Sequence, residues 1–158
     1  LYFNVIIFGI NWTKYIYSFN MIENFNNIYL LILHILIQVL FGFYLIRIIF
    51  SPEGMVKEFN VDKSGILPMR YVGTFAFGLV FIGIYILFRP NGPEGTWVYY
   101  NLFFIIAGSQ LIYDLLFYFK LIDKDIGAKN SLVDVFVSLF ATIVSIILIF
   151  GLSNKIYI

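Results

Sequence analysis

The chain has 158 residues, of which 61% are hydrophobic and 12% are charged, and its formal net charge is +1. An average soluble domain carries about 25% charged residues, so this composition is typical of an integral membrane protein. Lys and Arg are few and scattered, which argues against nucleic acid as a partner. The sequence contains no cysteine, which excludes disulfide bonds, thiolate metal ligands and cysteine nucleophiles.

Residues 1–20 are predicted to form an interfacial or re-entrant segment ahead of the membrane domain. Residues 1–10 are apolar but too short to cross a bilayer, and Trp12, Lys14 and Tyr15 follow them. This mixture of aromatic and basic side chains is typical of the lipid headgroup region. The alternative is that residues 1–20 form the end of a further span. Residues 21–158 are predicted to form a single membrane domain.

Four runs without formal charge dominate that domain, at residues 24–46, 71–88, 95–113 and 135–154. A hydrocarbon core of roughly 30 Å needs about 20 apolar residues in a helix. The runs are continuous and do not alternate with polar residues, which favours helices over a β-barrel. We therefore predict an all-α polytopic bundle, with spans at about 27–50, 68–88, 96–119 and 131–152.

The connections between the spans carry recognisable turn and cap signals. Residues 51–67 form a polar loop in which residues 55–59 are expected to make a short surface helix. Residues 89–95 contain two Pro and two Gly, which predicts a turn because a helix cannot continue through them. Ser131 is a suitable N-cap for the last span, and Asp134 three residues later predicts a capping box.

The positive-inside rule predicts the orientation of the bundle. One side would hold the loops 51–67 and 120–130, and the other side the turn 89–95 and both termini. Counting the Lys and Arg in the sequence puts seven on the first side and three on the second. We therefore expect a bacterial inner membrane protein with cytoplasmic loops and outside termini. The outer interface would then contain Trp12, Trp97, Tyr99 and Tyr100.

Each span carries one ionisable residue near the cytoplasmic end, namely Arg47, Arg70, Asp114 and Asp134. Charges at such depth are expensive unless they pair, and Arg pairs well with carboxylates. We predict an intramembrane network in which Asp114 and Asp134 meet Arg70, with Arg47 as a second partner or a lipid headgroup contact. Such a network could hold the helices together, or it could form a proton-coupled or anion-binding site. The alternative is that each side chain reaches the interface separately.

Small and polar residues recur at helical spacing on each span, as they do where membrane helices pack closely. These residues are predicted to face the interior of the bundle and to support helix packing. They are His34, Gln38 and Gly42 in the first span, Gly73, Thr74 and Gly78 in the second, Gln110 in the third, and Ser138 and Thr142 in the fourth.

His34 is the only histidine of the chain. We interpret it as a packing residue that is hydrogen-bonded to Gln38 or Tyr85. A ligand to a single-histidine haem, a quinone contact and a metal ligand are the alternatives, although one histidine cannot supply the two axial ligands of a b-type haem. No catalytic constellation stands out in the sequence. We therefore expect a protein that is not an enzyme and that carries no metal or cofactor.

Several of these features resemble those of a family of small four-helix bacterial membrane proteins of unknown function. The likeness covers roughly residues 28–152 and has no counterpart for residues 1–20. It rests on the proline-containing loop before the second span, residues 69–78 with their Arg and glycines, the small residues 107–109, and the acidic Asp114 and Asp134. The resemblance implies a four-helix bundle with an Arg–acid pairing, and it implies no activity.

These observations favour a non-enzymatic accessory or structural subunit that packs against other membrane proteins in a larger complex. The expected partners are the lipid bilayer and those subunits. The alternative is a small transporter or channel-like protein that uses Arg70, Asp114 and Asp134. A weaker alternative is a membrane anchor of a redox complex that uses His34.

Overall fold

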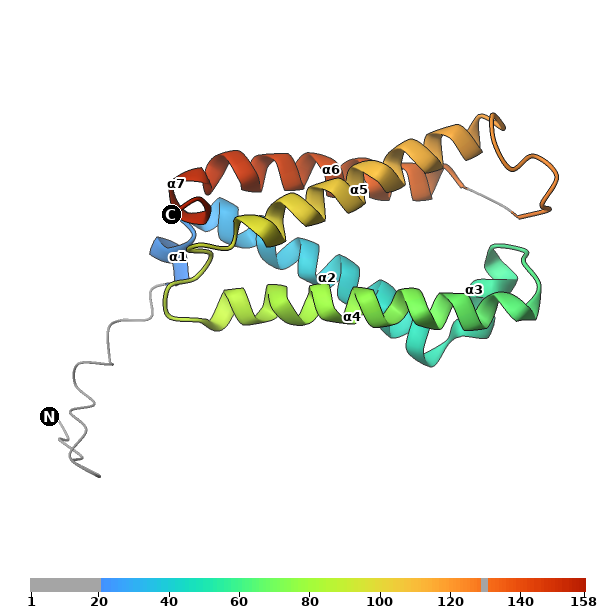
Figure 1. Ribbon diagram of the computed structural model, residues 1–158, viewed down its shortest axis with the longest axis horizontal. Coiled ribbons are helices and arrows are strands. Elements are labelled where there is room, and N and C mark those ends of the chain that lie inside the picture. Colours follow the sequence, from blue (N-terminus) through green and yellow to red (C-terminus); the bar gives the residue numbers. More distant parts are fainter. Residues whose placement is uncertain (1–20, 129–130) are drawn as a thin grey trace, which may run out of the picture.

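The computed structural model describes residues 21–128 and 131–158, and every regular element in these ranges is a helix (Figure 1). Four helices are long and apolar enough to cross a membrane. The prediction of an all-α bundle with four spans is therefore confirmed. The interfacial segment predicted for residues 1–20 lies outside the described residues. The long helices are α2 (Ile28–Phe50), α4 (Ile66–Phe88), α5 (Trp97–Tyr118) and α6 (Leu132–Gly151).

Four short helices complete the described chain: α1 (Met21–Asn24), α3 (Pro52–Glu58), η2 (Lys63–Gly65) and α7 (Ser153–Ile156). The helix α3 corresponds to the short surface helix expected within the first loop, but it is longer. It is also more than a surface feature, because Pro52, Met55 and Val56 are buried. This helix therefore packs its apolar side against the bundle.

Local side-chain chemistry explains where the long helices begin and end. The side chain of Asn27 accepts the N–H of Leu30 at 3.0 Å and caps α2. At the start of α6, Ser131 Oγ accepts the N–H of Asp134 at 3.3 Å, and Asp134 Oδ2 accepts the N–H of Ser131 at 3.0 Å. The predicted capping box is thus present. The predicted turn after α4 also forms, with left-handed backbone at Gly92 (φ 54°) and Gly95 (φ 69°).

The long helices pack mainly as two pairs, α2 with α4 and α5 with α6, and α2 also contacts α6. Figure 1 shows α4 and α5 diverging from the turn that joins them. That turn lies at the same end of the bundle as the C-terminus, and we call this the turn end. Residues 51–67 and 120–128 of the two loops lie together at the opposite end, which we call the loop end (Figure 1).

The turn end is closed by hydrogen bonds between segments far apart in the sequence. Asn26 Nδ2 donates to the carbonyl of Gly151 at 2.8 Å and to Asn154 Oδ1 at 2.7 Å. Asn24 Nδ2 donates to the carbonyl of Pro90 at 2.9 Å. Behind these contacts the apolar side chains Phe25, Leu152 and Ile156 are fully buried. The residues before α2, the turn and α7 therefore form one closed layer.

His34 is fully buried near this end and joins three helices. One ring nitrogen, Nε2, lies 3.0 Å from the Gly83 carbonyl of α4, and the other, Nδ1, lies 3.0 Å from the Tyr100 hydroxyl of α5. A carbonyl can only accept, so Nε2 carries the proton and Nδ1 accepts from Tyr100. This is the arrangement of a packing histidine, but with Gly83 and Tyr100 in place of the expected Gln38 or Tyr85.

The aromatic residues at the start of α5 divide between two environments. Trp97 is exposed, as expected for an interfacial anchor. Tyr99 and Tyr100 are buried inside the bundle instead, and their predicted depth at the outer membrane interface stays a prediction. Tyr99 accepts a hydrogen bond from Gln38 Nε2 at 2.7 Å, while Tyr100 binds His34. Their hydroxyls satisfy buried polar groups of α2, which draws both rings into the bundle.

Glycine allows α2 and α4 to approach closely. A Cβ atom at Gly73 would lie 2.7 Å from Ile48 Cγ2, and one at Gly83 would overlap the amide group of Gln38. The prediction that Thr74 and Gly78 also face the interior of the bundle is wrong. Thr74 is exposed, as is Arg70 on the same face of α4, and a Cβ atom at Gly78 would meet nothing within 4 Å. The buried face of α4 instead runs through Gly73, Val80, Gly83 and Ile86.

We predict that Gly83→Ala destabilises the bundle. The new methyl group would displace the Gln38 amide from Tyr99, and leaving such buried groups unpaired costs about 1–3 kcal/mol. Thermal unfolding in detergent, followed by Trp fluorescence, should show a lower midpoint. The matched control is Gly78→Ala, which has open space around its Cβ and should leave the midpoint unchanged or raise it. Equal midpoints for the two variants would contradict this account of the α2–α4 contact.

Candidate functional site

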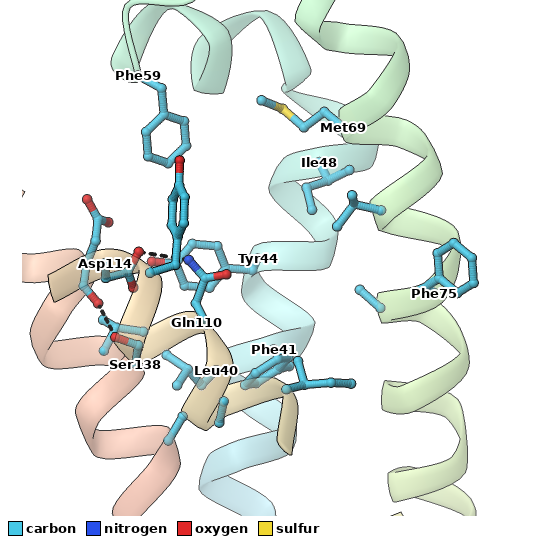
Figure 2. A pocket seen from close by; sticks show the side chains of 18 of the residues that line it. Leu40, Phe41, Tyr44, Ile48, Phe59, Met69, Phe75, Gln110, Asp114 and Ser138 are labelled. Atoms are coloured by element: carbon cyan, nitrogen blue, oxygen red, sulfur yellow. Dashed lines mark hydrogen bonds between the residues drawn. The ribbon is translucent and has the colours of Figure 1, made fainter. Parts of the chain in front are cut away.

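A cavity of about 600 Å³ lies among the four long helices at the loop end (Figure 2). Its volume falls within the range of roughly 300–1,000 Å³ that is usual for small-molecule pockets. All four spanning helices contribute side chains to it, and both loops contribute a few more. The cavity therefore occupies the part of the bundle where α4 and α5 have diverged.

The side of the cavity formed by α2 and α4 is apolar apart from Tyr44 of α2, and we call it the apolar wall. Figure 2 shows Met69 and Phe75 on α4 and Ile48 on α2 along this wall. Branched and aromatic side chains supply the remainder, so a ligand meets mostly carbon here. The apolar residues from these two helices are Leu40, Phe41, Ile48, Met69, Val72, Phe75, Ala76 and Leu79.

The opposite side, formed by α5 and α6, carries most of the polar lining residues beside apolar ones such as Phe117 and Val137, and we call it the polar wall. Asp114 is buried in the bundle, and Gln110 Nε2 donates to its Oδ1 at 2.8 Å. Asp134 Oδ2 also accepts the hydroxyl of Ser131 at 2.8 Å, in addition to the N–H in the capping box. Ser138 is buried, and its hydroxyl donates to the Asp134 carbonyl at 3.1 Å. Figure 2 shows Gln110, Asp114 and Ser138 gathered on this side.

Helical spacing places small side chains on the same faces of α5 and α6 as these polar residues. Ala107 and Asp114 are two turns apart on α5, and Ser138 and Ala141 lie about one turn apart on α6. Ala107 and Ala141 are both buried and small, which lets α5 and α6 pack closely along their length. The hydroxyl of Thr142 donates to the Ser138 carbonyl at 2.8 Å, within its own helix. These hydroxyls thus satisfy the backbone of α6 and do not link α6 to a neighbouring helix.

The two loops meet over the loop-end mouth of the cavity. Asn60 Nδ2 donates to the Gly127 carbonyl at 2.7 Å and so links the first loop to the second. Phe59 and Ile126 from the same loops line the cavity. Tyr113, which also lines it, donates its hydroxyl to Asp123 Oδ2 at 3.0 Å. The sequence did not predict these contributors. Phe59 and Ile126 lie in loops, which carry no periodic signal of where they fold back, and Tyr113 lies on α5 outside the positions predicted to face the interior.

The predicted Arg–Asp network does not form as expected. Arg47 forms an ion pair with Glu58 of α3, and its guanidinium also lies 6.0 Å from the ring centroid of Phe43. Arg70 lies outside the cavity and makes no ion pair with any carboxylate of the described residues. The reason is rotation about α4: Met69 and Val72 face the cavity, and Arg70 is about 100° from Met69. Only Asp114 and Asp134 of the network share the site.

His34 lies outside this cavity, and its two ring nitrogens are both occupied by hydrogen bonds. Ligation of a metal or a haem would require one of those bonds to break. Across residues 21–128 and 131–158, no three His, Asp or Glu side chains come close enough together to hold a metal ion.

Comparison of the chain with protein-family models, with curated proteins and with solved structures found no match. The resemblance to small four-helix bacterial membrane proteins therefore stays a prediction.

We predict that Asp134→Ala destabilises the protein although Asp134 lines the cavity. The substitution removes both carboxylate contacts of the capping box, and the loss of a helix cap typically costs about 1 kcal/mol. The midpoint of thermal unfolding in detergent should fall. Asp125→Ala is the control, because Asp125 is an exposed carboxylate in the adjacent loop. If both variants unfold at the temperature of the unmodified protein, the capping box contributes nothing to stability.

Proposed function

We propose that this protein is a non-enzymatic integral membrane protein that binds a lipophilic molecule in the loop-end cavity, in the manner of a small transporter or carrier. The observation that supports this proposal best is the cavity itself. It is large enough for a small molecule, and it separates an apolar wall from a polar one. A bundle with a purely structural role is expected to pack its helices to near-crystalline density along their whole length.

The two walls define the chemistry of the ligand. The apolar wall of α2 and α4 suits a hydrocarbon or ring body, which is retained by burial of its surface. The polar wall offers carboxylate, amide and hydroxyl oxygens, which can accept hydrogen bonds. The ligand class that matches both walls is an apolar molecule with a hydrogen-bond-donating head group, such as a long-chain alcohol. Asp114, Gln110 and Asp134 are the residues expected to meet that head group.

The cavity is accessible from the side of the bundle. Phe75 is 77% exposed and Val72 is 60% exposed, and both of them line the cavity on α4. Ile106 lines it on α5 and is 38% exposed. Residues that face both the cavity and the surroundings mark an opening between the two helices. A ligand dissolved in the bilayer would enter by this lateral route, without crossing the headgroup region.

This proposal develops the transporter-like alternative from the sequence, with a different set of residues. Asp114 and Asp134 remain, Gln110 and Ser138 join them, and Arg47 and Arg70 are not part of the site. The accessory-subunit hypothesis stays a prediction, since exposed apolar side chains suit lipid as well as a protein partner. The redox-anchor hypothesis loses support from the hydrogen bonds at both nitrogens of His34.

Photolabelling tests the binding function. A benzophenone-bearing long-chain alcohol is added to the full chain in nanodiscs, and the crosslinked peptides are identified by mass spectrometry. We expect crosslinks to concentrate on residues 69–79 and 106–117, which include the cavity-lining parts of α4 and α5. Ala76→Trp should fill the cavity and reduce these crosslinks several-fold.

The matched control is Val39→Trp, which places the same side chain on the exposed surface of α2. It should leave the crosslinks unchanged. Crosslinks spread evenly over the lipid-facing residues, or unaffected by Ala76→Trp, would refute the proposal.

We also propose that the loop end faces the cytoplasm of a bacterial inner membrane, on the basis of the asymmetry in Lys and Arg. Because the chain has no cysteine, single cysteines can report on the orientation. Ser64→Cys lies in the first loop and Asn91→Cys in the turn, and both positions are exposed. A membrane-impermeant maleimide should label Asn91→Cys in spheroplasts and should label Ser64→Cys only after permeabilisation. The reverse pattern would invert the orientation.

A further inference from the structure

A second hollow, of about 370 Å³, lies on the surface between α2 and α4, away from the polar wall of the cavity. Arg70 and Thr74 supply its polar atoms, and carbon lines the remainder. Arg70, Thr74 and Phe77 of α4 and Ile49 of α2 are all exposed around it. We call this hollow the α2–α4 groove. Its lining residues are Ile48, Ile49, Arg70, Gly73, Thr74 and Phe77.

Arg70 is the only charged residue of this groove. It is the fifth residue of α4, which places it about 6 Å along the helix axis from the first residue of that helix. A spanning helix passes through the lipid headgroup region at this depth. The other arginine at this end, Arg47, is neutralised by Glu58, whereas Arg70 has no carboxylate partner within the described chain. Its guanidinium is therefore available to an anion from outside the protein.

The remainder of the groove is apolar and continues toward the middle of the bundle. Gly73 forms part of the floor, where the helices approach so closely that a Cβ would lie 2.7 Å from Ile48 Cγ2. The hydroxyl of Thr74 donates to the Tyr71 carbonyl at 2.7 Å, so its hydrogen-bonding capacity as a donor is used within α4. Phe77 stacks on Phe81, with 6.1 Å between ring centroids and 21° between the planes. These rings extend the apolar wall by one turn beyond the groove.

We propose that the α2–α4 groove binds an anionic phospholipid, with its phosphate on Arg70 and one acyl chain along Ile49, Phe77 and Phe81. A guanidinium matches a phosphate by two parallel hydrogen bonds, and this geometry is specific to Arg. The apolar continuation below Arg70 selects a lipid over free phosphate, because inorganic phosphate would leave that surface empty. Glycerophospholipids present phosphate at both faces of a membrane, so the proposal holds for either orientation of the bundle. It is also independent of the ligand in the loop-end cavity.

Native mass spectrometry of the full chain released from detergent tests this assignment. The unmodified protein is titrated with phosphatidylglycerol and, separately, with phosphatidylcholine of the same acyl composition. We expect a larger bound fraction with phosphatidylglycerol. Arg70→Gln should lower that fraction several-fold, to the level seen with phosphatidylcholine.

Two further variants separate the groove from general electrostatic attraction. Thr74→Trp keeps Arg70 but fills the groove, and it should also lower the bound fraction of phosphatidylglycerol. Lys63→Gln removes an exposed positive charge at the same end of the bundle and should bind like the unmodified protein. Binding that survives Arg70→Gln or Thr74→Trp would overturn the proposal. Displacement of the lipid by millimolar inorganic phosphate would do so as well, because it would assign the site to a free anion.

Discussion

The hydrogen bonds of His34 hold α2, α4 and α5 together at one depth of the bundle. A polar ring inside an apolar core is tolerated only when both nitrogens are satisfied, and here Gly83 and Tyr100 satisfy them. The absence of a side chain at Gly83 leaves room for the Gln38 amide, and the Gly83 carbonyl accepts the hydrogen bond of His34. Gln38 in turn binds Tyr99, so two successive tyrosines of α5 are fixed by one face of α2.

This polar cluster and the asparagine contacts beside it close the turn end. The structural consequence is a cavity at the loop end. The helices α4 and α5 leave their common turn already divergent, and α4 follows α2 while α5 follows α6 (Figure 1). The space between the two pairs becomes the loop-end cavity, which the loops cross through the contact of Asn60 with Gly127. One end of the bundle is therefore closed by hydrogen bonds, and the other contains the cavity that we propose as a ligand site.

The four ionisable residues that the sequence predicts to form one network serve separate purposes. Arg47 is paired with α3, Asp134 caps α6, Asp114 faces the cavity beside Gln110, and Arg70 points into the α2–α4 groove. Their similar predicted depth in the membrane indicated one network. Whether two side chains meet, however, also depends on the direction in which each helix face points. The rotation of each helix about its axis brings Asp114 and Asp134 to the cavity and turns Arg70 away from it, which yields two chemically distinct surfaces, one with carboxylates and one with an arginine.

For the described residues, the sequence by itself determined the number and extent of the spans, because the cost of burying charges and unpaired backbone in hydrocarbon depends only on local composition. It also determined the capping box of Ser131 and Asp134 and the turn at residues 89–95, whose partners lie within a few residues of each other. Only the tertiary structure decided that Tyr99 and Tyr100 are buried, that Arg70 faces away from the aspartates, and that a cavity separates α4 from α5. Each of these depends on the rotation and divergence of whole helices, which are set by contacts such as that of His34 with Gly83, 49 positions apart in the chain.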